Sequence, residues 1–141
     1  MISRTRAGRA SVVLLLAAAL CGCSVDTLLW GADGGAVIAA TDQLIEAAAS
    51  GDAESLICPG TRPDLGSPDR WQRLSSEEPE RFTGEYWPDQ AALEPTWNIN
   101  LSLPGDRAVD GEVFPGDVFY RGEQDSLCVA DVVWSTVDVG D

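Results

Sequence analysis

The sequence predicts an α+β domain: an N-terminal helical hairpin packed on a three- to four-stranded antiparallel sheet, with one disulfide. Apolar residues recur at helical spacing in residues 35–50, whereas residues 96–103 and 126–139 have the character of strands. Helices followed by strands are typical of the α+β class. The chain has 141 residues, which is enough for one such domain.

A short apolar run precedes this domain. Residues 1–11 carry three arginines and no acid, and the run from Val12 to Leu20 contains only Val, Leu and Ala. A basic region followed by an apolar run of about 7–15 residues is typical of a secretory signal peptide. A membrane-spanning helix needs roughly 20 apolar residues, so we expect a removable leader rather than a span.

The end of the leader carries a recognisable motif. Leu20-Cys21-Gly22-Cys23 resembles the lipobox of bacterial lipoproteins. The resemblance implies that Cys23 receives a diacylglycerol on its sulfur and that a signal peptidase cleaves after Gly22. The alternatives are plain secretion and an intracellular redox or metal pair. The metal alternative lacks a second ligand pair at zinc spacing and any histidine.

This interpretation divides the chain into three parts. Residues 1–22 are the leader, residues 23–34 a lipid-anchored tether, and residues 35–141 a single domain. Two or three acyl chains hold a protein stably at a membrane. We therefore expect the protein on the extracytoplasmic face of the cell membrane. In the tether, Leu28-Leu29-Trp30 either contacts the membrane interface, which Trp favours, or packs on the domain.

The chain is strongly acidic, with a net charge of −14, no histidine and no lysine. Cleavage of the leader would make it more acidic, because the leader contributes only cations. Such a charge excludes nucleic acid as a partner. It indicates a solvated acidic surface or, alternatively, a surface for cationic partners.

Two cysteines, Cys58 and Cys128, lie in the predicted domain. In an oxidising compartment an isolated pair is most simply a disulfide. It would close a loop of about 70 residues and stabilise the fold by roughly 4 kcal/mol.

The first half of the domain reads as helices and loops. Residues 35–50 predict a helix that Gly51 ends in a left-handed conformation, and residues 53–58 predict the second helix of a hairpin. Ser67-Pro68 predicts the start of a short helix over 68–75. Residues 76–95 are polar and interrupted by prolines and Gly84, which predicts loops.

The second half reads as strands. Apolar and polar residues alternate over 96–103. The apolar side chains on one face are Trp97, Ile99, Leu101 and Leu103, and the opposite face is expected to be exposed to solvent. Residues 113–120 are either a hairpin or one bulged strand. Residues 126–139 are apolar on both faces, which predicts a central strand.

One sequence segment of the domain resembles the N-terminal part of known domains. LIEAAASGDAESL, residues 44–56, is similar to the helix–Gly-Asp–helix start of cystatin-like and nuclear transport factor two-like domains and of small actinobacterial lipoproteins. The resemblance implies a long N-terminal helix wrapped by a curved sheet. These families host many functions, so the fold does not carry one.

The composition excludes several kinds of chemistry. Without histidine and lysine, Ser-His-Asp, Cys-His and Ser-Lys catalysis and a Walker phosphate loop are all absent. We expect no cofactor and no resident metal. The turn-rich stretch 104–117 does offer four carboxylates to calcium (Asp106, Asp110, Glu112 and Asp117), but its spacing is not that of a calcium loop.

We therefore expect a non-enzymatic binding or accessory module, with an envelope protein or a small ligand as its partner. The candidate ligand-binding residues are the aromatic side chains Tyr86, Trp87, Trp97 and Trp134. Trp97 and Trp134 would line the concave face of the sheet. The alternative is a carboxylate-dependent cell-envelope glycan hydrolase, since Glu85 and Asp89 flank two of these aromatics.

Overall fold

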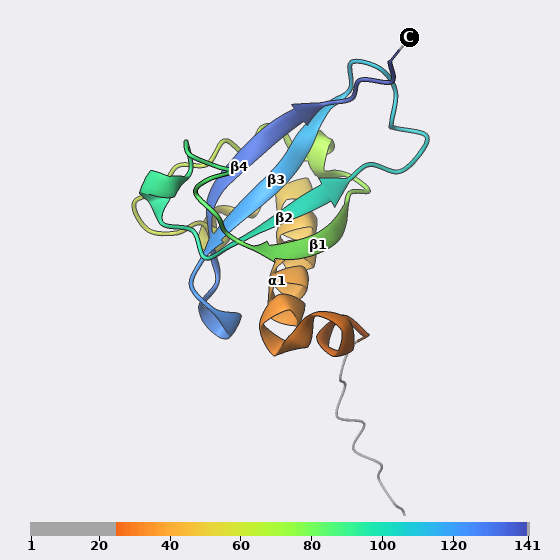
Figure 1. Cartoon of the computed structure of the whole chain (residues 1–141). Coiled ribbons are helices and arrows are strands. Elements are labelled where there is room, and N and C mark those ends of the chain that lie inside the picture. The colour runs from red at the N-terminus through yellow and green to blue at the C-terminus, as the bar shows by residue number, and fades with distance from the viewer. Residues whose placement is uncertain (1–24, 141) are drawn as a thin grey trace, which may run out of the picture.

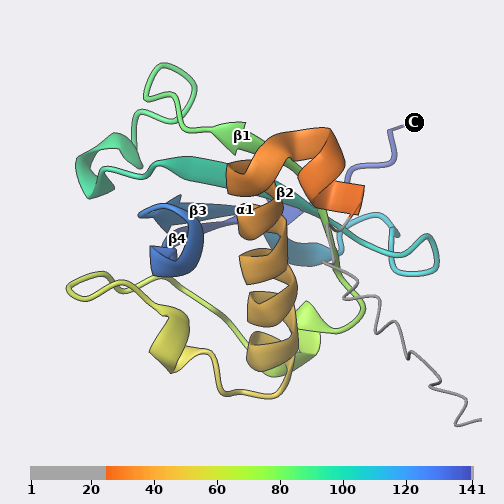
Figure 2. The same cartoon turned by 90° about the horizontal axis from the view of Figure 1, so that it is seen from below.

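One long helix lies against one face of a four-stranded antiparallel sheet in a computed structural model, which describes residues 25–140 (Figures 1 and 2). The helix and strands are α1 (Val25–Ala49), β1 (Ser75–Arg81), β2 (Trp97–Ser102), β3 (Val113–Arg121) and β4 (Cys128–Thr136). Single-turn 3-10 helices lie in the connections: η1 (Glu54–Leu56), η2 (Pro68–Trp71), η3 (Ala91–Leu93) and η4 (Gln124–Ser126). The α+β class and the number of strands agree with the fold predicted from the sequence.

The strands form a meander in the order β1-β2-β3-β4. Ile99 pairs with Val118, and Val118 pairs with Val132, so these three side chains form a row on the inner face, which α1 covers. All three are at most 5% exposed. Neighbouring residues on each strand point to the opposite, outer face of the sheet.

The α1 side of the core comes from residues at helical spacing. Val37, Thr41 and Leu44 are fully buried against the sheet. The helix ends as the sequence predicts. Gly51 has φ of 77°, and the amides of Gly51 and Asp52 bond to the carbonyls of Ala48 and Ala47, which caps the last turn.

The helix begins earlier than expected, at Val25, and therefore includes most of the predicted tether. It is kinked at Gly31, whose φ of 74° and ψ of 177° are not helical. The chain before the kink lies close to the chain after it. A Cβ on Gly34 would lie 2.7 Å from the Trp30 Cβ, and one on Gly35 would lie 2.8 Å from the Thr27 Oγ1. Only glycine permits this approach.

The predicted helical hairpin is wrong, because within residues 25–140 α1 has no second α-helix to pair with. After Asp52 the chain makes only the turn η1 and then becomes extended at Ile57. The Cys58 amide donates to the Val129 carbonyl at 2.8 Å, and Ile57 bridges Val129 in parallel. A second helix does not form here because the segment pairs with β4, is held by the disulfide and is followed by Pro59.

Two further predictions for the middle of the chain fail. The helix over 68–75 is limited to the turn η2, and the stretch 76–95 begins with strand β1 rather than a loop. The sequence of β1 contains Pro79 and a bulge between Ser76 and Pro79. An edge strand tolerates both, because one of its sides makes no ladder hydrogen bonds.

The structure also settles three expectations about the later strands: the position of β4 in the sheet, the form of β3 and the exposure of one face of β2. Strand β4 is an edge strand, not a central one, and Ile57, Cys58 and Thr61 contact part of its free side. Strand β3 is a single bulged strand, which decides between the two alternatives for residues 113–120. The face of β2 that was expected to be exposed to solvent carries Asn98, which is only 2% exposed.

Candidate functional site

The burial of Asn98 has a cause on the outer face of the sheet. There the β1–β2 connection, residues 82–96, covers one end of the strands. Phe82 and Trp87 pack edge-on against Phe119, with ring centroids 6.0 and 4.9 Å away. Phe119 is fully buried, so it forms a second small apolar core opposite α1.

Beyond this aromatic cover, the outer face carries amides and carboxylates. Asn98 pairs across the strands with Glu80, and its Nδ2 donates to the Glu80 Oε2 at 3.5 Å. Asn100 pairs with Asp117, and its Nδ2 donates to the Asp117 Oδ1 at 2.7 Å. We call Glu80, Asn98, Asn100 and Asp117 the amide–carboxylate cluster.

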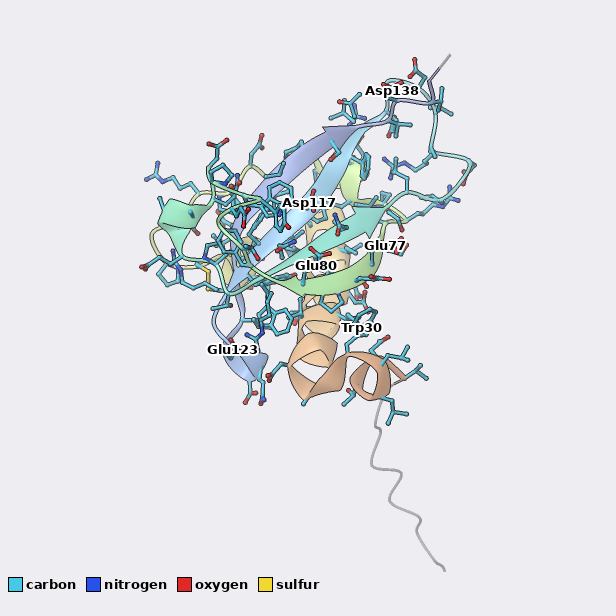
Figure 3. All side chains as sticks on the ribbon, viewed as in Figure 1. Trp30, Glu77, Glu80, Asp117, Glu123 and Asp138 are labelled. Carbon is cyan, nitrogen blue, oxygen red and sulfur yellow. A yellow bond between two sulfur atoms is a disulfide. The ribbon has the colours of Figure 1, made fainter. Side chains whose placement is uncertain are left out.

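Asp117 is the electrostatically unusual member of the cluster. It is only 7% exposed, and burial together with the nearby Glu80 charge raises its pKa to about 6. Glu80 and Asn100 are exposed at the same face. Figure 3 shows Asp117, Glu80 and Glu77 on the side of the sheet turned away from α1. The cluster can accept hydrogen bonds from a cationic group, and Asp117 can release a proton near neutral pH.

The predicted aromatic ligand residues are not brought together. Tyr86 is 77% exposed, Trp87 belongs to the cover on the outer face, and Trp97 and Trp134 lie on the inner side. Trp97 is only 7% exposed because α1 and the core fill that side. Trp134 donates its indole N–H to the Asp64 carbonyl at 2.9 Å and packs at Gly66.

Trp97 also belongs to a charged network at one end of the sheet. The Arg81 guanidinium lies 3.9 Å from the Trp97 ring centroid, and the Trp97 indole donates to Glu123 at 3.1 Å. Arg81 pairs with Glu123 at 2.6 Å and with Asp33 of α1 at 3.3 Å. The network therefore joins β1, β2 and the start of α1.

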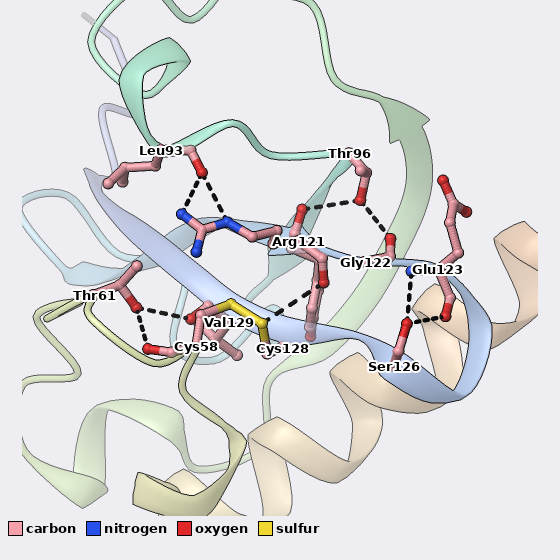
Figure 4. The surroundings of a disulfide bond; sticks show 11 residues. Cys58, Thr61, Leu93, Thr96, Arg121, Gly122, Glu123, Ser126, Cys128 and Val129 are labelled. Carbon is pink, nitrogen blue, oxygen red and sulfur yellow. Dashed lines mark hydrogen bonds between the residues drawn. A yellow bond between two sulfur atoms is a disulfide. The ribbon is translucent and has the colours of Figure 1, made fainter.

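The predicted disulfide is confirmed. Cys58 and Cys128 are bonded, across a sequence separation of 70. Figure 4 shows Thr61 beside the bond, donating its hydroxyl to the Cys58 carbonyl at 2.8 Å. In the same view the Arg121 guanidinium donates to the Leu93 carbonyl, which fixes the end of the β1–β2 connection. The disulfide thus fastens the segment after α1 to the free edge of β4.

A shallow hollow lies between the end of α1 and the segment 65–68. Its volume is about 270 Å³, below the roughly 300–1,000 Å³ usual for ligand pockets. Ala48, Ala53 and Leu65 line it, and Glu54 is its one charged lining residue. It does not bring two carboxylates together.

The carboxylates considered for calcium bind different partners. Asp106 pairs with Arg73 at 2.7 Å, and Glu112 pairs with Arg107 at 2.8 Å. Asp110 accepts from the Val139 amide, while Asp117 belongs to the cluster. Within residues 25–140, no group of three or more cysteine and carboxylate side chains is arranged to hold a metal ion.

The cluster was only partly visible in the sequence. The sequence places Asp117 in a Pro-Gly-Asp turn, among the carboxylates that it offers to calcium, whereas Asp117 lies inside β3. A signal did exist: an aspartate directly before the apolar run Val118-Phe119-Tyr120, opposite an Asn-x-Asn strand. Glu80 could not be found, because the strand that carries it was not predicted.

Two predicted sites lie elsewhere. Glu85 and Asp89 are exposed in the β1–β2 connection. Cys23 lies outside the described residues. Among residues 25–140, none of the helices has the length and hydrophobicity required to cross a membrane.

Comparison with known proteins identifies no relative of this chain. No family model matches the chain, and no curated protein or solved structure is significantly similar to it.

Proposed function

We propose that the chain is a lipoprotein, anchored by lipid on Cys23 to the extracytoplasmic face of the cell membrane, whose domain is a non-enzymatic binding or accessory module. The observation that carries the proposal is Leu20-Cys21-Gly22-Cys23 at the end of a basic and apolar leader. The Cys58–Cys128 bond supports the compartment, because such bonds persist outside the reducing cytosol.

The outer face of the sheet is the surface best suited to a partner. The inner face is filled by α1, and the hollow between the end of α1 and residues 65–68 is small. The outer face has exposed polar groups at Glu80 and Asn100 around the desolvated Asp117. Its chemistry suits a cationic segment of another envelope protein or a small cationic ligand.

Substitution at the lipobox tests the anchor. Cys23→Ser should abolish incorporation of labelled palmitate and release the protein from membranes. Cys21→Ala is the matched control, since a small residue at that position preserves the motif, and it should keep the label. Equal labelling of the two variants would contradict anchoring at Cys23.

Photo-cross-linking in the native host tests the binding module. A cross-linking side chain at Asn100, exposed on the outer face, should yield a discrete product. The same group at Ser55, exposed in η1 on another part of the surface, should not. Identical product patterns from both positions would contradict a partner on the outer face.

One observation favours a second candidate, a carboxylate-dependent glycan hydrolase. Such enzymes use one protonated and one ionised carboxyl, and Asp117 has a raised pKa beside the Glu80 charge. Incubation of the protein with cell-wall glycan separates the candidates. The hydrolase predicts turnover that Asp117→Asn and Glu80→Gln abolish, whereas the binding module predicts no turnover by the unaltered protein.

A further inference from the structure

The first described residues form a short apolar surface. Val25, Leu28, Leu29 and Trp30 are 69%, 75%, 70% and 39% exposed. They are four of the eight large apolar side chains found exposed in residues 25–140. Val25, Leu28 and Leu29 follow helical i, i+3, i+4 spacing, so they lie on one face of the segment before the Gly31 kink. We call these four residues the N-terminal patch.

The patch is held in a fixed position on the domain. Thr27 and Trp30 lie against Gly35 and Gly34 across the kink. Just after the kink, Asp33 is bound by Arg81 at 3.3 Å and by the Gln124 amide at 2.8 Å. These contacts fix the start of α1 to β1 and η4, so the segment is part of the folded domain rather than a loose tether.

The patch is exposed beside the proposed anchor. Cys23 precedes Val25 by two residues, a span of at most about 7 Å. Lipid chains on Cys23 would bring the bilayer surface to the patch. Trp at the level of the headgroups and aliphatic side chains below it are the usual composition of an interfacial contact. Asp26 is the one charged residue in Val25–Trp30.

We propose that Val25–Trp30 lies in the interface of the membrane that holds Cys23, with the N-terminal patch among the lipids. This inference rests on the proposed lipidation and adds a fixed orientation of the domain. Figure 1 shows this segment at one end of the molecule and the C-terminal end of the chain at the other. The end that carries Asp138 therefore points away from the membrane, and the outer face of the sheet stays open to partners (Figure 3).

Quenching by brominated lipid tests this orientation on the full lipidated chain. The protein is reconstituted in phosphatidylcholine vesicles with bromine at shallow acyl positions. The chain has five tryptophans, so the difference between the unaltered protein and Trp30→Phe isolates the Trp30 signal. Trp30 emission should be blue-shifted and strongly quenched. Equal fractional quenching of both proteins would overturn the proposal.

A surface variant provides a second readout. Leu28→Ser with Leu29→Ser changes two exposed residues and should largely abolish Trp30 quenching. The control Val109→Ser alters a side chain that is 55% exposed elsewhere and should leave quenching unchanged. Quenching that persists in the Leu28/Leu29 variant, or a cross-linked dimer formed through Leu29 with no quenching, would overturn the membrane contact.

The mass of the N-terminal peptide distinguishes the two levels of the proposal. A lipidated peptide with unquenched Trp30 refutes only the orientation. A peptide without lipid refutes the anchor and the orientation together.

Discussion

The hydroxyls of Thr41 on α1 and Tyr120 on β3 lie 2.9 Å apart in the buried core. Thr41 already donates its single proton to the Val37 carbonyl at 2.7 Å. The Tyr120 hydroxyl is therefore the donor and Thr41 Oγ1 the acceptor. This bond joins the helix to the middle of the sheet, and burial raises the pKa of Tyr120.

The direction of this hydrogen bond predicts unequal effects of its two deletions. Tyr120→Phe removes the donor and leaves Thr41 bonded to Val37, so it should cost about 1 kcal/mol of unfolding free energy. Thr41→Val leaves the phenol buried without its acceptor and should cost about 1–3 kcal/mol. Denaturant unfolding of both variants and of the double variant measures this. A double variant that costs the full sum of the two would contradict the pairing.

The contact across the Gly31 kink predicts intolerance to a single methyl group. Gly34→Ala should lower the melting temperature, although alanine favours helix by about 1 kcal/mol, because the new Cβ would meet Trp30. Gly105→Ala is the control, since nothing lies within 4 Å of its Cβ position. An unchanged or raised melting temperature for Gly34→Ala would mean that the segment before the kink does not pack as described.

Asp117 predicts a defined pH dependence. An unfolded aspartate ionises near pH 3.9, whereas the folded pKa is about 6. The folded state binds more protons in this window, so its stability falls as pH rises from about 4 to about 6 and then levels off. Asp117→Asn removes this loss. It should stabilise the protein by up to about 2–3 kcal/mol at pH 8 and by little at pH 4.

Thermal unfolding at the two pH values checks this prediction. The matched control is Asp89→Asn, an exposed aspartate in the β1–β2 connection, which should change neither value. If Asp117→Asn has the same effect at pH 4 and pH 8, the carboxyl is not desolvated in the folded protein.

The disulfide predicts a large loss of stability on reduction. A bond closing a sequence separation of 70 contributes about 4 kcal/mol in the chain-entropy model, a large part of a typical 5–15 kcal/mol. Reduction, or Cys58→Ala with Cys128→Ala, should lower the melting temperature by many degrees. Detection of two free thiols in the unreduced native protein would contradict the bond.

The parts of the fold that could be predicted from the sequence are those in which the spacing of apolar residues is regular. Helical spacing identified Val37 and Leu44 as core residues, and strict alternation identified the inner face of β2. Gly51 ended the helix as expected. The disulfide follows from the pair of cysteines in the domain and the oxidising compartment that the leader predicts.

The failures arise where tertiary contacts override local pattern. The strand β1, SSEEPER, has no alternation and contains a proline, so its pairing with β2 is visible only in the fold. The sequence of β4 looks apolar on both faces although β4 is an edge strand, because a bulge opposite Phe119 and Tyr120 shifts the register, so that Val129 and Val132 both lie in the core. The β1–β2 connection covers the outer face and buries Asn98. The sequence predicts loops over 76–95 but not where they lie on the sheet, so the desolvation of Asp117 is visible only in the fold.

The most direct test of the central proposal is the mass of the N-terminal peptide of the protein isolated from membranes of its native host. We predict a chain that begins at Cys23 and carries diacylglycerol on its sulfur. A chain that retains Met1 and the leader, or one that begins elsewhere with an unmodified Cys23, would contradict it.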